Sequence, residues 1–88
     1  MRFQFDPSKG KSNKKKHGIS FVDAEGIFYD PLAVHQLATD RADEERFVAV
    51  GMGSTGQVMV AVYTRRGEEI RLISARPATR REVKQYES

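Results

Sequence analysis

Four arginines near the C-terminal end are the residues of this 88-residue chain best suited to chemistry with anions. Arg71, Arg76, Arg80 and Arg81 follow one another with no acidic residue between them before Glu82. A guanidinium group presents a planar fork of N–H donors that matches two oxygens of a phosphate. The stretch therefore favours a phosphate-rich ligand, although the same arginines would also suit a solvated basic edge.

Local signals predict the elements that hold these arginines. Residues 69–75 have the period-two alternation of a strand, which should end near Arg76 because Pro77 cannot donate to a ladder. Thr79 and Glu82 have the spacing of a capping box, so a helix should run from Thr79 to about Tyr86. The arginines are thus expected at a strand end and in a first helical turn, where backbone N–H groups also attract anions.

Composition restricts the class of protein. The length predicts one domain spanning residues 1–88. The absence of cysteine excludes disulfides and thiolate metal sites, and fits a cytoplasmic protein. The two histidines have no ligand spacing, so we expect neither a metal nor another cofactor. The longest apolar run, residues 58–63, is too short to cross a membrane.

Charge is distributed in three blocks. Residues 1–18 carry six basic residues and one acid, residues 19–48 carry two basic residues and seven acids, and residues 49–88 carry seven basic residues and four acids. This pattern is expected for a protein with one anion-binding side. The run Lys14, Lys15 and Lys16 is either a solvated helix face or a contact for an RNA backbone.

The N-terminal half predicts a strand over residues 1–5 and two helices. Asp6-Pro7 should start a polar helix that ends before Gly18, and Ser20 should cap a second, amphipathic helix that Asp30-Pro31 stops. Residues 32–37 suit a short strand or an extended link, and residues 38–44 suit a loop.

The C-terminal half predicts a three-stranded antiparallel meander over residues 45–52, 57–64 and 69–75, with glycine-containing turns between the strands. Together with the helices this gives an α+β fold. The middle strand is apolar on both faces, so helices or a partner should cover both. We expect most of the core to come from Phe21, Ile27, Phe28, Val48, Val50, Val60, Val62 and Leu72.

An ordered set of short motifs resembles one protein family from about residue 5 to residue 86. The set comprises Asp6-Pro7, Lys16 to Phe21, Phe28 with Asp30-Pro31, Glu45-Arg46-Phe47, and Ile73 to Arg76 followed by Ala78 to Glu82. It resembles the BrnT-type toxins of bacterial type II toxin–antitoxin pairs. The resemblance implies a RelE-like fold and an endoribonuclease that arrests translation. It also implies a BrnA-type antitoxin partner, whose ribbon-helix-helix domain alone contacts operator DNA.

The ribonuclease activity that the resemblance implies suggests roles for particular residues. RNA cleavage without a metal needs a base for the ribose 2′-hydroxyl, an acid for the leaving oxygen and cations for the phosphorane. The catalytic candidates are Arg76, Arg80, Arg65, Arg46, His17 and Tyr63, and the RNA-binding candidates are Lys14, Lys15, Lys16, Arg71 and Arg81.

Several of these assignments have an alternative. Tyr63 also suits the core, and His17 also suits helix carbonyls next to a glycine cap. Glu45 is either a base or an edge-strand charge, and His35 lies outside the motifs. A binding module of the same fold without chemistry is the alternative function. The enzyme would be favoured if one concave patch brought together Arg46, Arg65, Arg76 and Arg80, with His17 or Tyr63 within reach. The binding module would be favoured if these residues were scattered over the surface.

Overall fold

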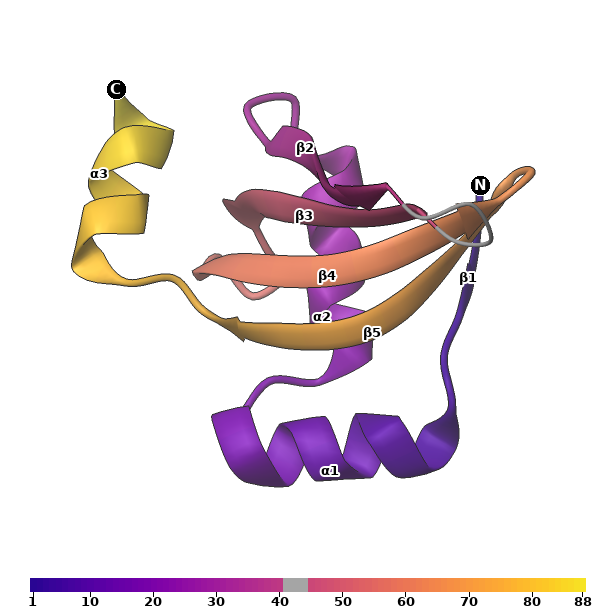
Figure 1. Ribbon diagram of the computed structural model, residues 1–88. Helices are drawn as coiled ribbons and strands as arrows, with labels where there is room; N and C mark the ends of the chain where they lie inside the picture. Colours follow the sequence, from indigo (N-terminus) through magenta and orange to yellow (C-terminus); the bar gives the residue numbers. More distant parts are fainter. Residues whose placement is uncertain (41–44) are drawn as a thin grey trace.

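The computed structural model describes residues 1–40 and 45–88 and shows an α+β fold around a five-stranded sheet (Figure 1). The spatial order of the strands is β1-β5-β4-β3-β2. Their bounds are β1 Arg2–Gln4, β2 Val34–Asp40, β3 Glu45–Met52, β4 Val58–Arg66 and β5 Glu69–Pro77. The helices are α1 Pro7–His17, α2 Phe21–Ala24 with the 3-10 turn η1 Glu25–Tyr29, and α3 Arg80–Glu87.

The sheet is wider than the predicted meander. Strands β3, β4 and β5 are antiparallel neighbours in chain order, while β2 pairs antiparallel with β3 and β1 pairs parallel with β5. The loop predicted for residues 38–44 is wrong for residues 38–40, which continue β2. The register shifts between Leu37 and Thr39, and Thr39 then pairs with Arg46. Residues 38–40 continue the strand because β3 offers backbone hydrogen-bonding groups along its edge. Residues 41–44 of that loop lie outside the described residues.

Helices α2 and η1 cover one face of the sheet, α1 runs along the outer edge of β5, and α3 lies at one end of the strands (Figure 1). There α3 contacts the opposite face of the sheet. The predicted caps are present. The side chain of Asp6 accepts from Ser8 N, and Gly18 closes α1 with a φ of 75°. The second predicted helix keeps α geometry only over Phe21–Ala24. It packs tightly, because a Cβ at Gly26 would lie 2.4 Å from the backbone nitrogen of Ser54.

The core lies between these helices and the sheet, and the sequence-based choice of sheet face was largely wrong. Phe21, Ile27 and Leu72 are buried as expected, together with Ile19, Ala24, Ala49, Met59, Ala61, Tyr63, Ile70 and Ala75. Val48, Val50 and Val62 are only half-buried and Val60 is buried, but all four belong to the opposite face. Phe28 is half-buried and packs against the core. Small residues at positions 49, 61 and 75 let the helices approach the sheet closely, which the bulkier valines would prevent.

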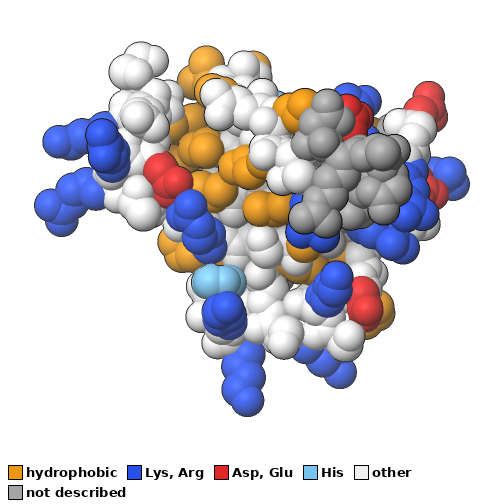
Figure 2. Space-filling model, in the orientation of Figure 1, with side chains coloured by type: hydrophobic (Ala, Val, Ile, Leu, Met, Phe, Trp, Pro, Cys, Tyr) orange, Lys and Arg blue, Asp and Glu red, His pale blue; other side chains and the backbone are white. Residues whose placement is uncertain are grey.

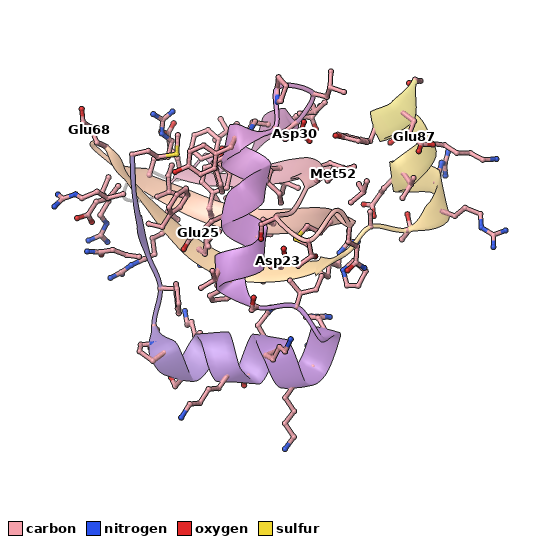
Figure 3. All side chains as sticks on the ribbon, turned by 180° about the vertical axis from the view of Figure 1, so that it is seen from behind. Asp23, Glu25, Asp30, Met52, Glu68 and Glu87 are labelled. Atoms are coloured by element: carbon pink, nitrogen blue, oxygen red, sulfur yellow. The ribbon has the colours of Figure 1, made fainter. Side chains whose placement is uncertain are left out.

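The predicted capping box begins α3. The hydroxyl of Thr79 accepts from Glu82 N, and the carboxylate of Glu82 accepts from Thr79 N. None of the residues of α3 is buried. Two polar contacts hold the helix against the body: Glu82 pairs with Arg76, and Tyr86 donates to Asp30 over 2.5 Å. Figure 3 shows Asp30 and Met52 close together on the side of the body that faces α3, in keeping with the 2.9 Å bond from Met52 N to the same carboxylate oxygen.

Candidate functional site

Strand β5 lines one margin of the sheet face opposite α2 and η1, here called the open face, with polar side chains. Arg71, Ser74 and Arg76 lie directly opposite Thr64, Val62 and Val60 of β4, and residues directly opposite in an antiparallel pair share a face. Valines of β3 and β4 form the floor beside this margin. Figure 2 views this face and shows apolar side chains in the middle, with Lys and Arg side chains around them.

Arg76 already holds a planar oxyanion. Its two terminal nitrogens donate to the two carboxylate oxygens of Glu82 over 2.8 and 2.9 Å, and one of them also donates to Pro77 O over 3.2 Å. The hydrogen bonds from Arg76 and from Thr79 N lower the pKa of Glu82 to about 2. The same pairing raises the pKa of Arg76. The guanidinium fork is therefore oriented for a planar oxyanion, and the Glu82 carboxylate occupies it.

The C-terminal end of α1 brings further basic residues to β5. A shallow depression of about 470 Å³ is lined by Ile73 and Ser74 on the strand and by Lys9, Ser12, Asn13, Lys15, Lys16 and His17 on the helix. Of the two alternatives for His17, the bond from its ring to a helix carbonyl is not formed among the described residues. Lys14 Nζ donates to the carbonyl of the cap residue Gly18 over 3.4 Å. His17 and Lys16 therefore flank the margin that carries Arg71 and Arg76.

Two predicted residues lie on the other side of the sheet. Tyr63 belongs to the core cluster and is 4% exposed, and with Arg65 it lines a hollow of about 330 Å³. Its hydroxyl lies 2.8 Å from His35 Nδ1, and its ring stacks on Phe47 with 5.4 Å between centroids. Burial, with a smaller contribution from Arg65, lowers the pKa of His35, and burial raises the pKa of Tyr63.

His35 is the titratable residue of this hollow that sequence reasoning missed. It lies opposite Ala49 on the helix-covered side, a position that depends on the register of β2 rather than on any motif. The predicted catalytic and RNA-binding residues are therefore divided between the two faces of the sheet. Arg46, Arg71 and Arg76 share the open face, His17 flanks it, and Arg80 and Arg81 follow in the exposed first turn of α3. Tyr63 and Arg65 are separate from them.

Two further properties concern the described part of the chain. Residues 1–40 and 45–88 contain no group of three or more His, Cys, Asp or Glu side chains placed to hold a metal ion. None of the helices in these ranges is long and apolar enough to span a membrane.

The fold and the arginines of the open face define a small α+β protein with a basic sheet margin. The family described as the ribonuclease toxin BrnT of type II toxin–antitoxin systems matches residues 5–82. The chain therefore belongs to the BrnT family of ribonuclease toxins, whose members have an antitoxin partner.

A solved structure agrees with this assignment. The chain is similar to the Brucella abortus ribonuclease toxin BrnT, known from a crystal structure at 1.1 Å resolution. The TM-score is 0.66 at 25% sequence identity, and the match covers 91% of this chain and 99% of the Brucella chain. A comparison with curated proteins found no match.

Proposed function

We propose that this protein is a cytoplasmic endoribonuclease that cuts RNA without a metal ion and thereby arrests translation, with residues 1–88 acting as one toxin domain. A BrnA-type antitoxin, which carries the ribbon-helix-helix domain and the contact to operator DNA, keeps it inactive. The observation that supports this proposal is the alignment of Arg71, Ser74 and Arg76 along β5, with His17 beside Ser74.

The proposed reaction uses the RNA's own 2′-hydroxyl as nucleophile. Its oxygen bonds to the adjacent phosphorus, the bond from phosphorus to the 5′-oxygen breaks, and the products are a 2′,3′-cyclic phosphate and a 5′-hydroxyl. In this scheme the imidazole of His17 accepts the 2′-hydroxyl proton, and a protonated group or water supplies the proton for the leaving oxygen. The forks of Arg76 and Arg80 stabilise the charge on the phosphorane oxygens.

RNA must compete with Glu82 for Arg76. The Glu82 carboxylate accepts both bonds from the guanidinium, and its helix has no buried residue to hold it in place. A phosphodiester of RNA offers a similar pair of acceptor oxygens with one negative charge, and the other basic residues along β5 attract the RNA backbone as well. We therefore expect the substrate phosphate to replace the carboxylate, and α3 to shift when RNA binds.

The test compares Arg76→Lys with Glu82→Gln in RNA cleavage measured with a chelator present. Arg76→Lys keeps the charge but loses the fork, so the rate should fall by about 10²–10³-fold. Glu82→Gln removes the competing charge and should cut at the parent rate or faster. Detection of the cyclic phosphate end checks the reaction type, and added antitoxin should stop cutting.

Arg65→Ala is the matched control, because Arg65 is a strand arginine on the other side of the sheet. We expect it to cut at close to the parent rate. Loss of cutting in Arg65→Ala, with normal cutting in Arg76→Lys, would move the chemistry to the hollow of His35 and Tyr63. A parent protein that binds RNA but cuts none, with ribosomes supplied, would leave only the binding-module function.

A further inference from the structure

Strand β2 forms an edge of the sheet, with β3 as its one neighbouring strand in the described part of the chain (Figure 1). The outer side of an edge strand presents backbone N–H and C=O groups that another strand can pair with, and natural proteins often protect it with lysine or proline. Residues 34–39, Val-His-Gln-Leu-Ala-Thr, contain neither. The register shift between Leu37 and Thr39 leaves residues 34–37 regularly paired with β3. This edge is therefore open to a further strand.

Exposed apolar side chains accompany the β2 edge. Val34 and Leu37 of the strand are 50% and 48% exposed, and Tyr29 and Leu32, which come directly before the strand in the chain, are also exposed. Val34 lies opposite Val50 on the open face, whereas Leu37 lies opposite Phe47 on the helix-covered face. Apolar surface is thus exposed on both sides of the same strand. Apolar exposure that is concentrated at one place is typical of a contact with another protein.

The hollow of about 330 Å³ lies beside the middle of β2, on the helix-covered side. From β2 it is lined by His35 and Leu37, and its other walls include the rings of Phe28, Phe47 and Tyr63 and the side chain of Arg65. The Tyr63 hydroxyl and the His35 ring bond to each other over 2.8 Å, so the aromatic walls suit an apolar group. A strand added to β2 would direct every second side chain to this face. One of these side chains can therefore enter the hollow next to Leu37.

Charge distinguishes between the two proteins that could supply this strand, a second copy of the chain and the antitoxin. Arg65 is an exposed cation of the hollow, and none of the described residues that line the hollow is acidic. Two copies paired antiparallel through β2 would bring the central residues of both strands together, and with them the two Arg65 side chains. Like charges that meet in an interface are unfavourable. The surface therefore suits a different protein, whose strand carries an acidic residue near an apolar one.

We propose that β2 pairs with an extended segment of the antitoxin, which inserts an apolar side chain into the hollow and places an acidic side chain against Arg65. The inference rests on the antitoxin partnership in the proposed function and adds the place where the two proteins meet. Backbone hydrogen bonds along β2 would provide affinity, and the hollow with Arg65 would provide specificity. Strands β3 and β4 separate β2 from β5, which carries Arg76. Variants at the β2 edge therefore leave the residues assigned to RNA cleavage in place.

Leu37→Glu tests the proposal because it places a negative charge at the edge and beside the hollow. Binding of the purified antitoxin, measured by surface plasmon resonance, should weaken about 10–100-fold. Val22→Glu is the matched control, since Val22 is an exposed apolar residue that lies beside α1 instead. It should bind within about twofold of the parent. The melting temperature of each variant shows whether it is folded.

Arg65→Ala tests the charged contact without altering the edge strand. Antitoxin binding should weaken about tenfold and depend less on salt concentration, because the pair with the acidic side chain is lost. Arg66→Ala removes the neighbouring arginine, which projects from the other face of β4, and should keep both the affinity and the salt dependence. Amide hydrogen exchange tests the backbone pairing. Alternate amides of residues 34–39 should gain protection in the complex, because every second N–H of β2 points outward.

Parent-like antitoxin binding by Leu37→Glu and Arg65→Ala overturns the proposal, and so do β2 amides that stay unprotected in the complex. A toxin that dimerises alone, and is monomeric as Leu37→Glu, would assign the edge to a second copy instead. Binding is measured without RNA, so these losses would establish the surface even if the parent cuts no RNA. Conversely, a parent that cuts RNA, with normal antitoxin binding by both variants, would refute the surface and leave the ribonuclease activity standing.

Discussion

A single buried amide joins the first helix to the sheet. Helix α1 has no apolar residue in its buried set, and Asn13 is its one buried side chain. The amide nitrogen of Asn13 donates to Ala75 O over 2.8 Å and to Ile19 O over 3.0 Å, and its oxygen accepts from Ala75 N over 3.0 Å. Asn13 thus completes the ladder at the outer edge of β5, beyond the short β1, where backbone groups would otherwise lack partners.

Loss of the Asn13 side-chain amide should destabilise the folded protein. Asn13→Ala leaves the N–H and C=O groups of Ala75 without partners, so we expect the free energy of unfolding to fall by about 2–3 kcal/mol. Urea denaturation measures this change. Ser12→Ala, at the exposed neighbouring position, is the control and should change stability by less than about 0.5 kcal/mol. An Asn13→Ala protein as stable as that control would show that α1 is held by other contacts.

At the scale of elements, α3 differs from the other helices because none of its residues is fully buried, and its side-chain hydrogen bonds to the body are the pairs Arg76–Glu82 and Tyr86–Asp30. Its contacts with the open face involve Glu82, Gln85 and Tyr86 around a cavity of about 130 Å³, lined also by Val34, Gln36, Val48 and Val50. Polar contacts on a partly exposed surface contribute little individually. We therefore expect α3 to leave the sheet before the remaining elements unfold.

The pKa of Glu82 makes this docking dependent on pH. The folded pKa of about 2 lies below the ordinary value of 4.5, so the ionised carboxylate is favoured when α3 is docked. Its contribution is therefore fully present above pH 4.5 and is lost as the pH falls towards 2. Amide hydrogen exchange of residues 80–87 should accelerate over this range relative to the core strand β4. In Glu82→Gln the same amides should exchange faster already at neutral pH, and an unchanged pattern would contradict the role of the pair.

At the scale of the whole molecule, we expect the distribution of charge to affect the affinity for RNA more than the rate of RNA cleavage. Lys15 and Lys16 line the depression next to Ser74, and Lys14 is bound to Gly18 O. Replacing all three lysines by alanine should weaken RNA binding at low salt and make log Kd less dependent on log salt, because these charges neutralise the RNA backbone. The cleavage rate at saturating RNA should stay close to the parent value.

The control for this experiment is the triple replacement by arginine, which keeps the charge and should keep the salt dependence. Equal salt slopes for the parent and the triple alanine variant would show that RNA does not pass this end of α1.

The sequence by itself determined the elements whose signals are local. The Asp6 cap, the Thr79–Glu82 capping box and the glycine turns at Gly56 and Gly67, with φ of 90° and 60°, were predictable because a few neighbouring residues fix each geometry. The ordered set of motifs from Asp6-Pro7 to Glu82 likewise indicated the family, and the C-terminal part of that set contains the site candidate Arg76.

Only the tertiary structure decided which face of the sheet the helices cover. Alternation in β4 gives two apolar faces, and the choice between them depends on how closely the helices can approach Ala49, Ala61 and Ala75, which are distant in sequence. The same choice separates Arg65 and Tyr63 from Arg76, pairs Tyr63 with His35, and places Thr64 between two arginines. Each of these relations depends on the register between strands, and no local pattern of residues encodes that register for an isolated strand.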